Sequence, residues 1–215
     1  MTTAILITRP DHDLITTYLY HWTTYVVNAA NRKGIKLFDL KKDKATYKIF
    51  KSYIKKHQPT FVFFNGHGSI DSIAGYNDKI LIRLNYNERL LAQKIVYARS
   101  CDAGDKLGPS CIKKGTLAFI GYRKKYSLGY TPAKVTRPLE DEVARLFIEP
   151  SNLIPISLLK SNKVEDAYRR SQEAMLRNLR FMLSTRATSA QKDAAPYLWM
   201  NKKYQVTYGN QEAHI

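Results

Sequence analysis

The stretch TFVFFNGHG, residues 60–68, decides the fold of this chain. Its first five residues form a continuous apolar run, which is typical of a central parallel strand buried on both faces. The run ends at an Asn-Gly pair, and His67 follows between two glycines. A parallel sheet binds its ligands beyond the carboxyl ends of its strands. The stretch therefore predicts an α/β sheet with a histidine at its ligand-binding edge.

A second stretch of the same kind, KIVYARSCDAG at residues 94–104, ends near a cysteine. Its apolar part predicts another buried strand, and Cys101 follows that strand, with Gly104 after it. If the two strands are neighbours, the imidazole of His67 and the thiol of Cys101 meet above the sheet. An imidazole can accept the proton of an adjacent thiol, so this pair supplies a base and a nucleophile. The glycines leave backbone N–H groups that can hold an oxyanion.

The rest of the chain alternates between strand and helix patterns. We expect strands at residues 4–8, 35–40, 60–64, 79–84, 94–98 and 116–121, of which 79–84 is either a hairpin strand or an edge strand. We expect a first helix that is capped by Asp11 or Asp13 and runs to about residue 32, and a short one that is capped by Asn85 or Asn87 and runs to residue 93. Further helices are expected at about 43–57, 105–113, 139–147 and 163–183, then a strand-like end at 198–208. This order predicts one α/β domain over residues 1–215, with a mostly parallel central sheet flanked by helices on both faces. The part from about residue 138 to 215 is expected to be mainly helical.

Composition narrows the class of protein. The 215 residues suffice for one α/β domain, and 44% of them are hydrophobic. No apolar run reaches the length of a membrane span, and the first residues lack the basic segment of a signal peptide, which predicts a cytoplasmic protein. The two cysteines and five histidines form no zinc motif, so neither a metal nor another cofactor is expected.

The formal net charge of +17 leaves the partner open. It is compatible with an acidic protein substrate, with a nucleic-acid surface, or with no specific partner, because charge governs association rather than fold. Tyrosines near lysines favour a nucleic-acid surface, but no helix-turn-helix, RRM or zinc pattern accompanies them.

An apolar strand ending in His-Gly, followed by an apolar strand ending in Ser-Cys-x-x-Gly, resembles the caspase-fold cysteine peptidases. This group includes caspases, metacaspases, legumains, gingipains, separases and CHAT domains. The segment after Cys101 is most similar to CHAT domains, since a helix, the apolar strand from Thr116 to Ile120, and a helix with Ala167 and Gln172 follow in the same order. The resemblance covers roughly residues 60–180.

The resemblance implies a caspase-like three-layer sandwich and a role for each of several residues. It implies that His67 is the general base and Cys101 the nucleophile, and that the backbone N–H groups of Gly68 and Cys101 form the oxyanion hole. Two features depart from caspases. The spacing of 34 residues from His67 to Cys101 is shorter than the roughly 50 residues of caspases, and the Q-A-C-x-G signature is absent.

Further residues have expected roles. In related peptidases the residue two before the nucleophile lines the specificity pocket, and here it is Arg99. A guanidinium there favours a carboxylate, so we expect Arg99, with Asp102, to bind the substrate and to select Asp or Glu, unless Arg99 is a structural residue paired with a carboxylate. Asp71 or Asp78 is a candidate for orienting His67, and Cys111 is expected in the core.

The leading interpretation is thus a cysteine endopeptidase that works through a thioester acyl-enzyme. We expect its substrate to be a protein or peptide with acidic residues, and a regulatory partner is compatible with this interpretation. Two alternatives stay open. One is a catalytically silent caspase-like domain that acts through partner contacts, and the other is a basic nucleic-acid-binding α/β protein.

Overall fold

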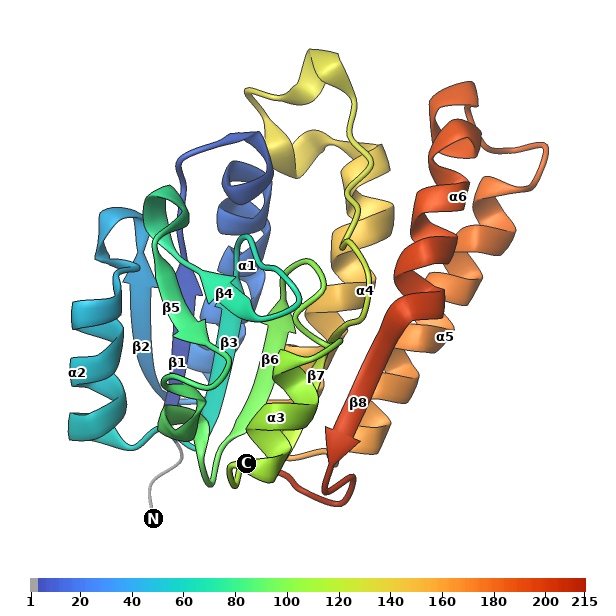
Figure 1. Cartoon of the computed structure of the whole chain (residues 1–215). Coiled ribbons are helices and arrows are strands. Elements are labelled where there is room, and N and C mark those ends of the chain that lie inside the picture. Colours follow the sequence, from blue (N-terminus) through green and yellow to red (C-terminus); the bar gives the residue numbers. More distant parts are fainter. Residues whose placement is uncertain (1–3) are drawn as a thin grey trace.

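The computed structural model describes residues 4–215, whose strands form one large sheet and one small sheet (Figure 1). The large sheet has the spatial order β2-β1-β3-β6-β7-β8. Its strands are β1 (Ala4–Arg9), β2 (Lys36–Lys41), β3 (Phe61–Asn65), β6 (Ile95–Arg99), β7 (Ala118–Tyr122) and β8 (Gln205–Gly209). Five of them are parallel, and β8 runs antiparallel to β7. The predicted mostly parallel sheet is confirmed.

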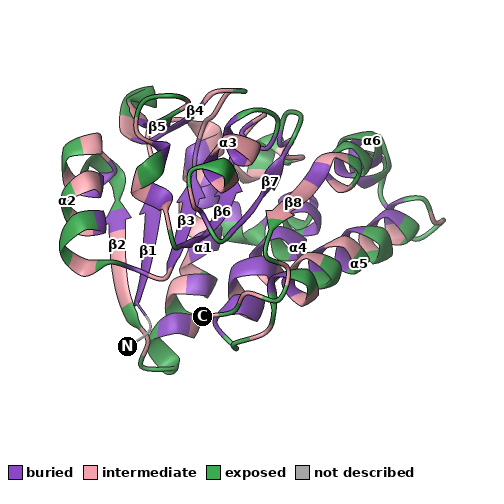
Figure 2. Ribbon diagram, turned by 60° about the horizontal axis from the view of Figure 1, so that its bottom comes forward, coloured by how far each residue is buried: buried purple, intermediate pink, exposed green. Residues whose placement is uncertain are grey.

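Helices cover both faces of this sheet. They are α1 (Leu14–Arg32), α2 (Tyr47–His57), α3 (Leu107–Lys113), α4 (Glu142–Leu158), α5 (Val164–Met182) and α6 (Ser189–Tyr204). Successive strand residues point to opposite faces. Phe61 and Phe63 therefore pack toward α1 and α4, whereas Val62 and Phe64 pack toward α2 and α3. Figure 2 shows the central strands buried between these layers. None of the helices in the described residues is both long and apolar enough to cross a membrane.

The small sheet is a hairpin of β4 (Ser72–Ala74) and β5 (Ile80–Arg83), inserted between β3 and β6 in the chain. The strand predicted at 79–84 is therefore present as β5, and of the two expected placements, hairpin or sheet edge, the hairpin is the one found. Short 3₁₀ helices complete the structure: η1 (Lys42–Lys44), η2 (Tyr76–Asp78), η3 (Glu88–Leu91), η4 (Pro132–Lys134) and η5 (Pro138–Glu140). The helix expected at 87–93 is the single short turn η3.

The C-terminal third differs most from the sequence expectation. Helix α4 continues past residue 147, through Pro150 and Pro155, because most of its side chains are buried and their packing outweighs the backbone hydrogen bonds that the prolines remove. Helix α6 extends to Tyr204, so the expectation of strand structure from residue 198 is wrong up to that residue. The side chain of Thr188 accepts a hydrogen bond from the backbone N–H of Gln191 and starts α6 with a capping box.

Candidate functional site

His67 lies just beyond the carboxyl end of β3, where the chain leaves the main sheet. The preceding Gly66 has a φ of +139°, a conformation that L side chains rarely adopt, and it turns the chain out of the strand. A Cβ atom at Gly68 would lie 2.8 Å from the backbone oxygen of Cys101. Glycine at position 68 therefore lets the segment that carries His67 lie directly against the segment that carries Cys101.

Cys101 occupies the matching position after β6. Strands β3 and β6 are parallel neighbours, and their register pairs Asn65 with Arg99. His67 and Cys101 each follow this pair by two residues. Both residues line one cavity of about 610 Å³. The expectation that the two strand ends are neighbours is confirmed, while the catalytic roles of the two residues stay predictions.

Asp13 holds the imidazole of His67. It is the N-cap of α1, where its Oδ1 accepts a hydrogen bond from the backbone N–H of Thr16 at 2.8 Å, and its Oδ2 lies 2.5 Å from Nε2 of His67. Burial alone would raise the pKa of Asp13, but hydrogen bonds from Thr16 and His67 outweigh burial and lower the pKa below 3.8. Asp13 is thus a carboxylate at neutral pH. Because a carboxylate only accepts, Nε2 of His67 carries a proton, which leaves Nδ1 as the basic nitrogen.

The partner of His67 differs from the sequence expectation. Asp71 and Asp78 were the expected candidates, yet neither forms a hydrogen bond with His67. Asp71 bonds to a serine in its own loop. Asp13 showed in the sequence only the signature of a helix cap, and it stands 54 residues from His67. The two meet because β1 and β3 are adjacent in the sheet.

The thiol of Cys101 forms no hydrogen bond with His67 within residues 4–215. It donates weakly to the backbone oxygen of Tyr126, at 3.8 Å from Sγ. Burial raises the pKa of Cys101, and the charge of Asp102 raises it further. The resting thiol is therefore protonated at neutral pH, and chemistry at the sulfur requires a base. Nδ1 of His67 is the nearby candidate.

Two backbone N–H groups beside the thiol lack an acceptor. Among residues 4–215, neither the N–H of Gly68 nor that of Cys101 donates a hydrogen bond. Such donors are available to a developing negative charge on a ligand oxygen. The lack of an acceptor for these two N–H groups is compatible with the expected oxyanion hole, whose function stays a prediction.

Arg99 corrects the expectation about substrate binding. Its side chain is fully buried and does not line the cavity. Its guanidinium lies over the ring of Phe63 and donates hydrogen bonds to Asn65, Ser151, Asn152 and Thr23. The prediction that Arg99 binds an acidic substrate residue is wrong, because its donors are already used inside the protein. Arg99 is thus a structural residue, but it is paired with amide and hydroxyl oxygens and not with a carboxylate, which was the structural pairing expected from the sequence.

Two further sequence expectations concern Asp102 and Cys111. Asp102 follows Cys101 with a φ of +58° and is partly exposed, and the cavity lining does not include it. Its role in substrate binding stays a prediction. Cys111 is fully buried in α3, as expected for a core residue, and burial raises the pKa of its thiol to about 12. Cys101 is therefore the more accessible and more acidic of the two thiols.

The cavity is lined by α1, by the segments that follow β3, β6 and β7, and by α4 and α6. Apolar and aromatic side chains dominate the lining, namely Ile15, Tyr126, Leu128, Tyr130, Val143 and Tyr197. Besides the ionisable His67 and Cys101, the lining residues that carry charge are Lys125 and Asp193. The cavity is thus suited to an apolar group placed next to the thiol.

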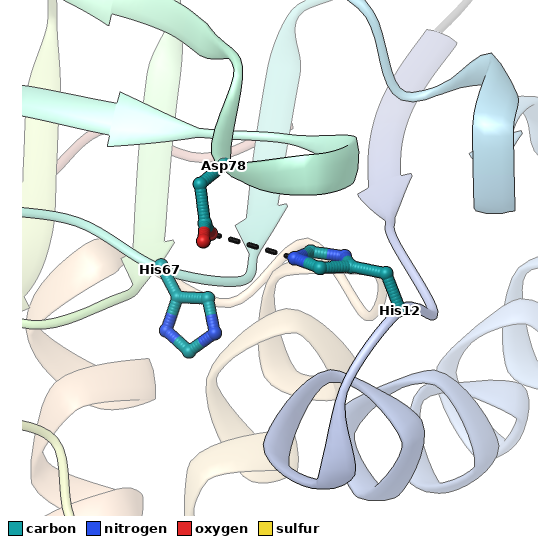
Figure 3. A group of neighbouring side chains, drawn as sticks. All are labelled: His12, His67 and Asp78. Carbon is teal, nitrogen blue, oxygen red and sulfur yellow. Dashed lines mark hydrogen bonds and ion pairs between the residues drawn. The ribbon is translucent and has the colours of Figure 1, made fainter.

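A second histidine lies near His67 (Figure 3). His12 precedes α1, and its ring centroid is 6.0 Å from that of His67. Nε2 of His12 is 3.4 Å from Oδ1 of Asp78 and 3.7 Å from Oδ2 of Asp13. His12, His67 and Asp78 each offer one atom to a group in which all atoms lie within 4.8 Å of one another. Nitrogen and oxygen atoms in this arrangement are able to hold a metal ion.

Comparisons by sequence gave no match, either to a protein-family model or to a curated protein. Comparisons by structure did. The chain is similar to two gingipain structures: the complex of Porphyromonas gingivalis RgpB pro- and mature domains (TM-score 0.59, 12% identity) and the Arg-specific cysteine proteinase gingipain R (TM-score 0.58, 12% identity). It is also similar to a structure described as a protease (TM-score 0.57, 14% identity).

Each likeness covers 100% of this chain and 47–48% of the other, so the chain spans about half the length of these neighbours. At 12–14% identity the likeness establishes the fold, which is the caspase-like α/β fold. It does not assign the chain to the gingipains or to the CHAT domains within that fold.

Proposed function

We propose that the chain is a cysteine endopeptidase in which Cys101 is the nucleophile, His67 the general base, and Asp13 the residue that positions the imidazole. Nδ1 of His67 accepts the thiol proton, and the sulfur attacks the carbonyl carbon of the scissile bond. The N–H groups of Gly68 and Cys101 donate to the oxyanion. His67 returns the proton to the leaving amine, and water hydrolyses the resulting thioester.

One observation carries this proposal. His67 and Cys101 stand at equivalent positions beyond two neighbouring parallel strands and line the same cavity. The contact between Asp13 and His67 supports it, because a carboxylate that holds one imidazole nitrogen leaves the other poised to accept a proton. The likeness to cysteine proteinases of the same fold agrees with this chemistry.

The resting position of the sulfur defines one step of the mechanism. Cys101 contacts the backbone oxygen of Tyr126, so a change of its side-chain rotamer must bring the sulfur to His67 when the substrate binds. Catalytic hydrogen bonds are often loose in unliganded enzymes and tighten in the complex.

The lining of the cavity points to the class of substrate. Its apolar and aromatic side chains favour an apolar or aromatic residue next to the scissile bond, in place of the acidic residue expected from the sequence. Tyr130 and Tyr197 would contact that residue. The substrate is a protein or peptide.

The partly buried, protonated thiol favours a second candidate, a catalytically silent caspase-like domain that binds a partner. The two candidates differ in a single measurement, hydrolysis of peptides by the purified chain.

The test uses a mixed peptide library with the wild type, Cys101→Ala and Cys111→Ala, the last as the matched control. We expect the wild type and Cys111→Ala to cleave after large apolar residues and Cys101→Ala to lose all cleavage. Cleavage that survives in Cys101→Ala would reject the nucleophile. Absence of cleavage in the wild type would favour the silent domain, and a preference for Asp or Glu would contradict the account of the cavity.

A further inference from the structure

Ligand-type side chains from three separate segments meet beside the candidate base. His12 and Asp13 directly precede α1, His67 follows β3, and Asp78 ends η2. Figure 3 shows three of them, His12, His67 and Asp78. No sequence motif indicated this group, because its members are spread over 66 residues and match no metal-binding pattern. The fold brings them together.

The spacing between His12 and Asp78 suits a metal better than direct hydrogen bonding, whereas His67 is already hydrogen-bonded to Asp13. Nε2 of His12 and Oδ1 of Asp78 are 3.4 Å apart, which is beyond the usual range of about 2.7–3.2 Å for an N–H···O hydrogen bond. Two ligand atoms of a tetrahedral zinc ion, with bonds of about 2.1 Å, lie about 3.4 Å apart. The pair is therefore set at the separation of two zinc ligands.

The burial of His12 gives an independent indication. The side chain of His12 is 9% exposed, and its Nδ1 is buried without a partner among the described residues. Its Nε2 faces the carboxylates of Asp78 and Asp13 at 3.4 and 3.7 Å. A buried imidazole is rarely left with one nitrogen unpaired and the other in long contacts only. A cation in front of Nε2 would give this nitrogen a strong interaction.

We propose that His12, His67 and Asp78 bind a divalent zinc ion. Two imidazoles and one carboxylate form a typical donor set for Zn²⁺ and leave a fourth position of the tetrahedron for water or for Asp13. The two carboxylates give the site a negative charge that favours a cation, in a chain with a net charge of +17. The ligand atoms already lie within 4.8 Å of one another, so small side-chain movements close the site.

Zinc at this site would switch off the proposed peptidase. A neutral imidazole has one lone pair available, so when one ring nitrogen of His67 binds zinc the other nitrogen carries the proton and cannot accept one from Cys101. This consequence rests on the proposed function, whereas the binding of zinc does not. This inhibition differs from inhibition by zinc bound to the thiol, because Cys101 is not among the ligands of the proposed site.

The binding test therefore uses the full chain in a Cys101→Ala background, which removes the accessible thiol. Competition with a chromophoric zinc indicator measures affinity and stoichiometry, and circular dichroism confirms that each variant is folded. We expect one Zn²⁺ per chain and a loss of affinity of at least about tenfold on adding His12→Ala or Asp78→Asn. Asp78 is two-thirds exposed, so its substitution leaves the core intact. His214→Ala, at an exposed histidine, is the matched control.

Equal zinc affinity in Asp78→Asn, His12→Ala and the His214→Ala control would overturn the proposal, as would the absence of bound zinc in Cys101→Ala. With Cys101 restored, zinc should inhibit peptide hydrolysis, and Asp78→Asn should raise the inhibitory concentration at least about tenfold. The binding measurement needs no peptidase activity, so it remains decisive if the proposed function fails.

Discussion

Asp13 has two tasks at the residue scale. One oxygen caps α1 through Thr16, and the other holds His67. The cap fixes the carboxylate at the start of a rigid helix, and this in turn fixes the orientation of the imidazole. The role that we assign to Asp13 is to position His67, not to contact the substrate.

The substitution Asp13→Asn separates the two tasks. Asparagine is also a good N-cap, so the unfolding midpoint should change little. The amide no longer imposes the same tautomer on His67, and kcat should fall by roughly 10²- to 10⁴-fold with little change in KM. Steady-state kinetics with a peptide substrate, together with thermal unfolding, measure both effects.

A kcat close to the wild-type value would show that Asp13 only caps α1. Asp13→Ala serves as the comparison, because it removes the cap as well and should cost about 1 kcal/mol of stability in addition to the loss of kcat.

The sequence predicted His67 and Cys101 as site residues because each follows an apolar strand, with glycines on both sides of His67 and Gly104 three residues after Cys101. It did not identify Asp13, since contact with His67 depends on which strands are neighbours in the sheet. It misplaced Arg99 for a related reason. Strand parity indicates the face of the sheet toward which a side chain points, but not whether a helix covers it, and here α4 covers Arg99 with Ser151 and Asn152.

At the scale of elements, Arg99 ties together the strands that carry the site. Its guanidinium connects β6 to Asn65 at the end of β3, to Thr23 in α1 and to the Ser151–Asn152 pair in α4. These contacts hold the carboxyl ends of β3 and β6 in register, directly below His67 and Cys101.

Arg99→Met should therefore destabilise the protein by about 3 kcal/mol, because the substitution leaves several buried acceptors without donors. Urea denaturation measures the loss, and Arg170→Met, at an exposed position on α5, should change stability by less than about 0.5 kcal/mol. Equal effects of the two substitutions would contradict the structural role of Arg99. If the wild type preferred acidic peptides and a folded Arg99→Met variant lost that preference, Arg99 would bind substrate after all, and the structural role would be contradicted.

The helices of the C-terminal third show where local signals compete. The helix expected at 139–147 continues to Leu158 through Pro150 and Pro155, because most of its side chains are buried. For α6, the pattern Thr188-x-x-Gln191 was a capping-box signature that predicts a helix start, and the aromatic residues that follow concealed it by their preference for strands.

At the scale of the whole molecule, the chain is strongly basic and depends on a few well-bonded carboxylates. Glu88 is almost fully buried, and its oxygens accept hydrogen bonds from the backbone of Asn85 and Tyr86 and from the hydroxyl of Ser110. Burial raises the pKa of Glu88, but these hydrogen bonds outweigh burial, and the pKa lies below 4.5. Asp13 also has a lowered pKa.

A lowered pKa in the folded state means that the unfolded chain binds more protons. The stability that Glu88 contributes is therefore fully present above pH 4.5 and is lost as the pH falls through its folded-state value. We expect Glu88→Gln to cost about 1–3 kcal/mol at pH 7, with a smaller difference from the wild type at pH 3.5. Denaturant unfolding at both values tests this, and a difference independent of pH would contradict it.

The partner that the net charge of +17 would favour and the cytoplasmic location also stay predictions. The sheet explains the position of the site, whereas the net charge affects the binding of partners. Measured affinity for single-stranded nucleic acid, and its dependence on salt, would test the nucleic-acid alternative.

The central claim is that Cys101 is a nucleophile activated by His67. The most direct test is labelling with an electrophilic peptide that carries an apolar residue next to the reactive group, followed by mass-spectrometric mapping of the modified cysteine. We predict that Cys101 alone is modified in the wild type, that Cys111 is not, and that His67→Ala slows labelling by at least about a hundredfold. Labelling of Cys111 at an equal rate, or labelling of Cys101 that is unchanged in His67→Ala, would contradict the account.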